Sequence, residues 1–194
     1  EIYSGTLKAS TSGQLGAGLK KLTFADRGTL LFTDDVEFNG GGNDLHSLFL
    51  MNASGGIRLE SGKTLTIYDN VVPFGSGGVV NIVSNVNLED TLYFVTPDKD
   101  MTDEPRFFFS GNKTVQHNGG VIYNLGSVFE ISNAAFRDNH ADGTAANGGV
   151  LYASGGESNF ARSFFEANSA AGSGGYGGNG GAIYLQGKAR VNVS

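Results

Sequence analysis

The histidines and one dense group of acidic residues are the first places to look for metal chemistry in this chain. The histidines, His46, His117 and His140, show no His-x-x-x-His spacing, so the sequence predicts no histidine metal site. The acidic group comprises Asp98, Asp100, Asp103 and Glu104. It begins like a calcium loop, but Asp103 stands where such a loop needs glycine and Phe109 where it needs glutamate. We interpret the group as a solvated acidic insertion, and we expect neither a metal nor a cofactor.

Tyrosines recur at regular positions and could form a binding surface. Tyr123, Tyr152 and Tyr184 occupy the same place in three similar segments, and Tyr176 lies in the glycine-rich loop 169–179. In an alternating strand the first three point away from the core, where aromatic side chains favour protein or glycan interfaces. Two structural alternatives stay open: the rings stack between neighbouring strands, or a loop covers them. Tyr176 is either a contact residue or part of a solvated loop.

The tyrosines belong to a pair of motifs that occurs three times in one order. The motifs are Phe-x-x-Asn, at 109–112, 136–139 and 165–168, and Gly-Gly-x-x-Tyr, at 119–123, 148–152 and 180–184. Tyr123 lies 13 residues before Phe136, and Tyr152 lies 13 residues before Phe165. The stretch from the asparagine to the glycine pair instead lengthens from six to eight to eleven residues. Length changes confined to one corner of a fixed repeat indicate a stack of coils rather than a globular core.

The repeated segments have the composition of short strands. Val-Phe-Glu-Ile at 128–131 and Val-Asn-Val at 191–193 alternate with period two. Glycine and asparagine interrupt every possible helix before about ten residues. The sequence therefore predicts an all-β fold, a right-handed parallel β-helix (a solenoid), because parallel crossovers are right-handed in the large majority of cases.

In such a coil, like residues of successive turns should stack in columns inside. The predicted columns are Phe109, Phe136 and Phe165; Ile122, Leu151 and Ile183; and Asn112, Asn139 and Asn168. The asparagine amides are expected to hydrogen-bond to one another along the axis. The glycine pair is expected where the backbone bends or approaches its neighbour closely.

The repeat rule weakens toward the N-terminus. We interpret residues 1–24 as an N-terminal cap or irregular first coil and residues 25–194 as the β-helix, with an insertion at about 96–105. Leu-Leu-Phe-Thr-Asp-Asp at 30–35 resembles a degenerate Phe-x-x-Asn that ends in aspartate. Ile67 to Asn70 begins a clearer degenerate coil, and Phe94, 13 residues after Asn81, is expected to take the next phenylalanine place. At the other end the pattern stops before the next Phe-x-x-Asn, so we expect the array to continue past Ser194.

Composition excludes several other classes of protein and site. The chain has no cysteine, so it can form neither a disulfide nor a thiolate metal site. A net charge of −6 argues against nucleic acid as a partner, since phosphate binding needs a basic face. No apolar run approaches the roughly 18 residues of a membrane-spanning helix, so this segment is not expected to span a membrane.

The paired motifs resemble those of the chlamydial polymorphic membrane proteins and of similar autotransporter passenger domains. The resemblance covers about residues 67–194 and is strongest over 109–187. Gly-Gly-Ala-Ile at 180–183 is the family's tetrapeptide letter for letter, whereas the other copies have valine in the third place. The resemblance implies a right-handed β-helix, export by an autotransporter route, and a location at the bacterial cell surface or outer membrane, or secretion. It also implies adhesion to host cells and a C-terminal outer-membrane β-barrel as the anchor of the full chain.

Together these observations favour a binding module without catalysis, an adhesin that contacts a host-cell surface protein or glycan. One alternative is a β-helical polysaccharide lyase or hydrolase, which needs acidic residues grouped on one strand face at a defined separation. Here the acids fall mostly in turns, at Asp35, Asp69 and Asp138. The other alternative is a structural stalk that carries a distal domain.

Overall fold

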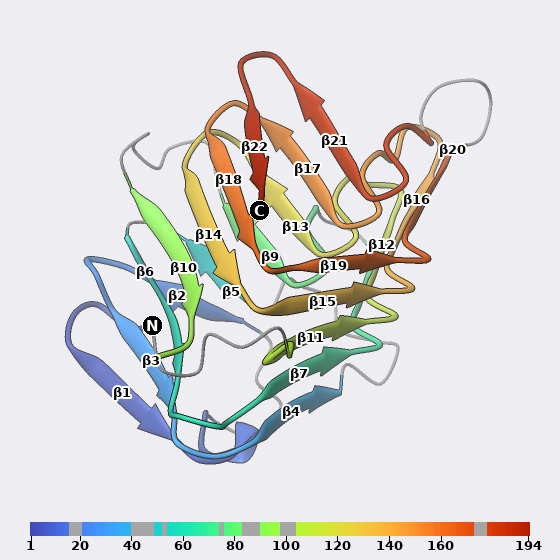
Figure 1. Ribbon diagram of the computed structural model, residues 1–194. Helices are drawn as coiled ribbons and strands as arrows, with labels where there is room; N and C mark the ends of the chain where they lie inside the picture. The colour runs from blue at the N-terminus through green and yellow to red at the C-terminus, as the bar shows by residue number, and fades with distance from the viewer. Residues whose placement is uncertain are drawn as a thin grey trace.

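The computed structural model describes residues 1–15, 21–39, 49–51, 54–73, 76–82, 90–97, 104–172 and 178–194. Within these ranges the chain is almost entirely β, and the exception is a short 3-10 turn, η1 (Ser12–Leu15). The strands form four sheets in which every recorded pairing is parallel (Figure 1). The predicted all-β class is therefore confirmed. No helix in the described ranges has the length and hydropathy needed to cross a membrane.

Each sheet collects strands from along the whole chain. The seven-stranded sheet contains, in spatial order, β1 (Thr6–Ala9), β3 (Thr29–Phe32), β6 (Gly55–Leu59), β10 (Thr91–Val95), β14 (Val128–Ser132), β18 (Glu157–Ala161) and β22 (Arg190–Val193). The six-stranded sheet contains β2 (Leu22–Phe24), β5 (Phe49–Met51), β9 (Val80–Ile82), β13 (Ile122–Asn124), β17 (Leu151–Ser154) and β21 (Ile183–Gln186). The five-stranded sheet contains β4 (Val36–Asn39), β7 (Leu65–Tyr68), β11 (Phe107–Ser110), β15 (Ala134–Arg137) and β19 (Phe164–Glu166). The four-stranded sheet contains β8 (Val71–Val72), β12 (Lys113–Val115), β16 (His140–Gly143) and β20 (Ser169–Gly172).

Neighbouring strands of one sheet come from successive passes of the chain through the other three sheets. Between β10 and its neighbour β14, for example, the chain forms β11, β12 and β13, one in each of the other sheets. The next pass from β14 to β18 repeats this order with β15, β16 and β17. In Figure 1 the strands β4, β7, β11, β15 and β19 accordingly lie one above the next. Residues that are equivalent in successive passes therefore become neighbours.

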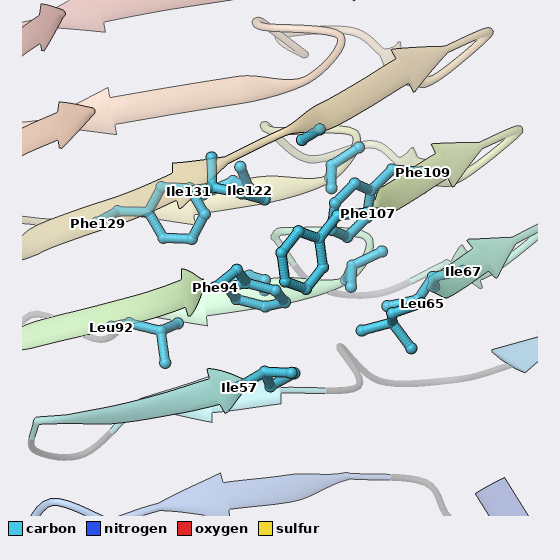
Figure 2. Close-up of a cluster of buried hydrophobic side chains, with 14 of the residues drawn as sticks. Ile57, Leu65, Ile67, Leu92, Phe94, Phe107, Phe109, Ile122, Phe129 and Ile131 are labelled. Atoms are coloured by element: carbon cyan, nitrogen blue, oxygen red, sulfur yellow. The ribbon is translucent and has the colours of Figure 1, made fainter. Parts of the chain in front are cut away.

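The core lies between the sheets because side chains alternate along each strand. In β11, Phe107 and Phe109 are buried and Phe108 between them is only partly covered. Phe94 of the seven-stranded sheet packs edge-on against both buried rings, with ring centroids 5.7 Å and 6.0 Å apart. Figure 2 shows Phe94, Phe107, Phe109 and Ile122 converging on this interior. Each such buried side chain stabilises the fold by about 1.5–3 kcal/mol.

The two ends of the stack are more open than its middle. One inward column of the seven-stranded sheet runs from Leu7 through Leu30 and Phe94 to Val193. Leu30 and Phe94 are fully buried, whereas Leu7 is 45% and Val193 is 55% exposed. The first 24 residues contribute β1 and β2, and Leu15 of η1 packs against the core. The N-terminal segment therefore takes part in the sheets as well as lying at one end of them.

The structure corrects the position predicted for Phe94. It lies beside Ile57 and Ile131 in the seven-stranded sheet and not in the phenylalanine column. Phe109 instead pairs directly with Ile67. The count of 13 residues fails because the segment between β9 and β10 is longer than the segment between β13 and β14. Phe94 therefore lies on a strand of the seven-stranded sheet, which the chain forms just before the strand of the five-stranded sheet that holds the motif phenylalanine.

A second correction concerns the degenerate motif at 30–35. Phe32 pairs with Leu59 in the seven-stranded sheet, and Phe38 is the residue in register with Ile67. Asp35 does not stand in the asparagine column. Its carboxylate accepts hydrogen bonds from the backbone N–H and the hydroxyl of Thr64, at 2.8 Å and 2.9 Å. In the sequence Asp35 resembles a replacement for the motif asparagine, although its carboxylate bonds to Thr64 instead.

Candidate functional site

An asparagine ladder follows the five-stranded sheet. The Oδ1 of Asn139 accepts from the backbone N–H of Asn112 at 3.1 Å and from its Nδ2 at 3.0 Å. Asn168 accepts the same two hydrogen bonds from Asn139, at 3.1 Å and 2.9 Å. Asn112 and Asn139 are fully buried. Asn70 extends the ladder toward the N-terminus by donating its backbone N–H to Asn112.

The same amides tie the ladder to the phenylalanine column. The Nδ2 of Asn139 donates to the carbonyl oxygen of Phe109 at 3.0 Å, and that of Asn168 donates to Phe136 at 2.9 Å. The ring of Phe136 stacks on Phe109 with centroids 4.9 Å apart and on Phe165 at 5.1 Å. These motif residues thus form a continuous internal scaffold. The phenylalanine rings pack against one another, and the asparagine amides form hydrogen bonds within the chain.

The aliphatic column and the glycine pairs complete this scaffold. Ile122, Leu151 and Ile183 are in register on the six-stranded sheet. Gly148 has a positive φ of 69°, which other residues adopt at a cost. A Cβ on Gly149 would overlap the carbonyl oxygen of the glycine above it and lie 2.5 Å from another backbone oxygen. The first glycine therefore makes the bend, and the second permits the close approach of backbone from the next pass of the chain.

A second asparagine ladder was not predicted. It consists of Asn118, Asn147 and Asn179, each directly before a glycine pair. Asn147 donates its backbone N–H to the Oδ1 of Asn118 at 2.8 Å, and Asn179 donates to Asn147 at 3.2 Å. The side-chain amides repeat the pattern at 3.2 Å and 3.0 Å. The signal was present in the sequence, because the motif reads Asn-Gly-Gly in all three copies.

The three tyrosines lie together on the outer side of the six-stranded sheet, as a stack. Tyr152 has its ring centroid 5.1 Å from that of Tyr123 and 5.5 Å from that of Tyr184. Tyr152 is only 8% exposed, and its hydroxyl donates to the Oε1 of Gln186. Of the alternatives that the sequence left open, stacking between neighbouring strands is the one observed: the middle ring offers no free face because its neighbours cover both sides. Surface for a partner is left mainly at Tyr123 and Tyr184, which are partly exposed.

Burial also changes the acidity of two of these phenols. It raises the pKa of Tyr123 above its ordinary value, although a hydrogen bond with Ser76 opposes the change. Burial likewise raises the pKa of Tyr152, and the neighbouring tyrosines add to the effect because two phenolates would repel each other. Tyr123 and Tyr152 are therefore neutral at physiological pH and act through hydrogen bonding and packing.

The remaining candidates are dispersed or fall outside the described residues. His46, Tyr176, Asp98, Asp100 and Asp103 lie outside them. The Nδ1 of His140 lies 2.7 Å from the hydroxyl of Ser169, and the carbonyl oxygen of His117 accepts from Thr114 at 3.0 Å. Within the part of the chain that the structure describes, no three metal-binding side chains come together.

A shallow pocket lies on the outer face of the five-stranded sheet. Its volume is about 310 Å³, and it is lined by Thr66, Phe108, Phe109, Ser110, Ala135 and Arg137. The Nε of Arg137 donates to Glu166 at 3.0 Å. None of these residues was singled out as a site residue from the sequence, apart from Phe109 as a core residue. The available signal was the doubled phenylalanine: where a phenylalanine points inward, an adjacent one must point outward.

Comparison with known proteins adds no relative to this description. No protein-family model matches the chain, and searches of curated proteins and of solved structures returned no match. The functional argument therefore depends on the residues of this chain.

Proposed function

We propose that this chain is a right-handed parallel β-helix from the passenger region of a bacterial surface protein, and that it binds host cells without catalysis. The order in which the chain visits the four sheets, pass after pass, supports a coiled solenoid. The usual handedness of parallel crossovers supports the right hand. The paired Phe-x-x-Asn and Gly-Gly motifs support the passenger assignment and, with it, exposure at the cell surface or secretion.

The observation that carries the binding role is that each repeat has a constant part, used in the interior, and one corner of variable length. The recurring residues, such as Phe136, Asn139 and Gly149, are used inside the stack for packing and ladders. Among the three full copies of the repeat, from Phe109 onward, the length changes only at the corner between the asparagine and the glycine pair, where β12, β16 and β20 lie. A rigid scaffold with one variable edge is typical of proteins that bind partners through loops and outer faces.

The charged side chains of the outer face support a binding role over a catalytic one. Lys113 is paired with Asp142 at 2.5 Å, and Arg137 is paired with Glu166 at 3.0 Å. Asp69 and Asp138 occupy turn positions with positive φ, where their role is to make the bend before the asparagine ladder. Their positions are explained by the turn itself.

The proposal is tested by adding the fluorescently labelled 194-residue chain to cultured epithelial cells. We expect saturable binding that weakens when Tyr123 and Tyr184 are both changed to serine. Tyr3→Ser is the matched control, because Tyr3 is 63% exposed and lies outside the stack. An absence of binding would support the stalk instead, and turnover of a polysaccharide by the purified chain would support the lyase or hydrolase.

A further inference from the structure

The outer face of the five-stranded sheet carries aromatic side chains that the core does not require. Phe108 on β11 and Phe164 on β19 belong to one outward row, with Ala135 on β15 between them. Phe108 is partly exposed and Phe164 is 51% exposed. Apolar side chains that lie together on a surface mark a binding site more often than scattered ones do, and these belong to one row. The face therefore needs an explanation that packing within the chain does not give.

Polar groups converge beside the same row. The pocket of about 310 Å³ is lined by Phe108 together with Ser110 and Arg137. Thr66, in register with Phe108, adds a second hydroxyl. Hydroxyls both donate and accept hydrogen bonds, so Thr66 and Ser110 can contact a ligand hydroxyl in either role. The volume lies at the lower end of the range for small-molecule sites.

The guanidinium of Arg137 is held in place by its neighbour. The recorded ion pair joins Nε of Arg137 to Glu166 at 3.0 Å. This contact uses one of the five N–H groups, so the terminal Nη groups can donate to a ligand without breaking it. The Arg137 and Glu166 side chains are 59% and 68% exposed, so this surface ion pair leaves the guanidinium accessible to a ligand.

The charges around the pocket select against anionic ligands. Glu37 is in register with Thr66, and Asp138 follows Arg137 directly in the turn. Asp69 reaches toward Gly111, the residue after Ser110. These carboxylates, together with Glu166, outnumber Arg137 and would repel an anion. A neutral ligand rich in hydroxyl groups avoids this repulsion and matches the hydroxyls of Thr66 and Ser110.

We propose that this pocket binds a neutral saccharide. The apolar side of one sugar ring packs on Phe108, and its hydroxyls bond to Thr66, Ser110 and the Nη groups of Arg137. Phe164, two coils further along the same row, provides a second apolar contact for a following sugar. The site is separate from the tyrosine stack, and the inference does not depend on the proposed role of that stack.

The test is a glycan array probed with the intact 194-residue chain, followed by calorimetric titration of the best neutral oligosaccharide. We expect neutral sugars to bind in preference to matched sugars that carry a carboxylate or sulfate. Phe108→Thr and Arg137→Gln should each weaken binding by about tenfold or more, a loss of one directed contact. Arg190→Gln is the matched control, since Arg190 is an exposed arginine on the seven-stranded sheet.

Thermal unfolding followed by circular dichroism checks that both variants keep the fold. Preference for carboxylated or sulfated sugars would overturn the proposal, as would binding that is unchanged in both variants of a folded protein. Absence of binding to every neutral sugar at millimolar concentration would overturn it too. Cell binding that is lost in the tyrosine variant, with saccharide binding retained, would separate the two sites.

Discussion

At the scale of single residues, Asn139 shows how one side chain joins its own pass of the chain to the passes before and after it. Its amide group accepts two hydrogen bonds from Asn112, donates to Asn168, and donates to the carbonyl oxygen of Phe109. All of this takes place with the side chain fully buried. Removing it would leave several polar groups without partners in a region that water does not reach.

We expect Asn139→Ala to lower the free energy of unfolding by about 1–3 kcal/mol, because buried donors and acceptors lose their partners. Urea denaturation followed by circular dichroism measures the change. Asn192→Ala is the control, since Asn192 makes its side-chain hydrogen bonds at the surface. Equal effects of the two substitutions would mean that the internal ladder adds nothing to stability.

The tyrosine stack is expected to make the free energy of unfolding fall at alkaline pH. The pKa values of Tyr123 and Tyr152 are raised by burial, so the folded state holds their protons more tightly than the unfolded state does. The contribution of these phenols to stability is therefore full below the ordinary tyrosine pKa of about 10 and is lost as pH rises through the raised values. We expect thermal stability to fall in that range, and Tyr152→Phe to reduce the fall. A melting temperature with the same pH dependence in both proteins would contradict this account.

At the scale of the elements, the phenylalanine column holds the five-stranded sheet against the seven-stranded one. Phe136 stacks between Phe109 and Phe165 and packs edge-on against Phe160, with centroids 5.7 Å apart. It is fully buried. Its ring therefore joins its own pass of the chain to the preceding and following ones and connects the two sheets.

Phe136→Ala should destabilise the protein by roughly 3–5 kcal/mol, through lost burial and the cavity that remains. Phe164→Ala is the matched control, because that ring is on the same sheet but 51% exposed. We expect its effect on the urea midpoint to be small. A comparable loss at both positions would place Phe136 outside the core.

The glycine pair makes a similar prediction about the turns. Gly149→Ala would force a methyl group against two backbone segments of the next pass of the chain, at Ser169 and Gly181. We expect misfolding, or a loss of stability well beyond the approximately 1 kcal/mol by which glycine and alanine ordinarily differ. Gly13→Ala, where the nearest atom to an added Cβ lies 3.8 Å away, should fold normally. Limited proteolysis of both variants compares them directly, and equal resistance would contradict the proposed close approach.

These elements also show what the sequence could and could not predict. The constant spacing within the repeat was enough to place Phe136 and Asn139, because the motif phenylalanine follows the preceding tyrosine by 13 residues and the asparagine follows the phenylalanine by three. It failed at Phe94, since an extra segment before β10 shifted the count by one strand. The low exposure of Tyr152 could not be predicted from alternation, because its stacked neighbours Tyr123 and Tyr184 cover it. Alternation does predict the outward position of Phe108, because Phe109 beside it points inward.

At the scale of the whole molecule, one sheet runs from the first strand to the last. In the seven-stranded sheet, Thr6, Glu130 and Asn192 belong to a single outward row, and all three are exposed. Four strand-to-strand steps separate Thr6 from Glu130, and six separate it from Asn192. If the chain is a coiled solenoid, distance along this row depends on the number of coils and not on the number of residues.

The most direct test is pulsed electron paramagnetic resonance between spin labels on this row. The chain has no cysteine, so Thr6→Cys combined with Glu130→Cys or with Asn192→Cys labels only the chosen sites. With strands about 4.8 Å apart, we expect a backbone separation of about 19 Å for the Thr6–Glu130 pair and about 29 Å for the Thr6–Asn192 pair. The spin-label linkers add a similar length to both distances. The second distance should exceed the first by about 10 Å. Two equal distances, or a broad distribution in either pair, would contradict the coiled architecture and the binding role proposed from it.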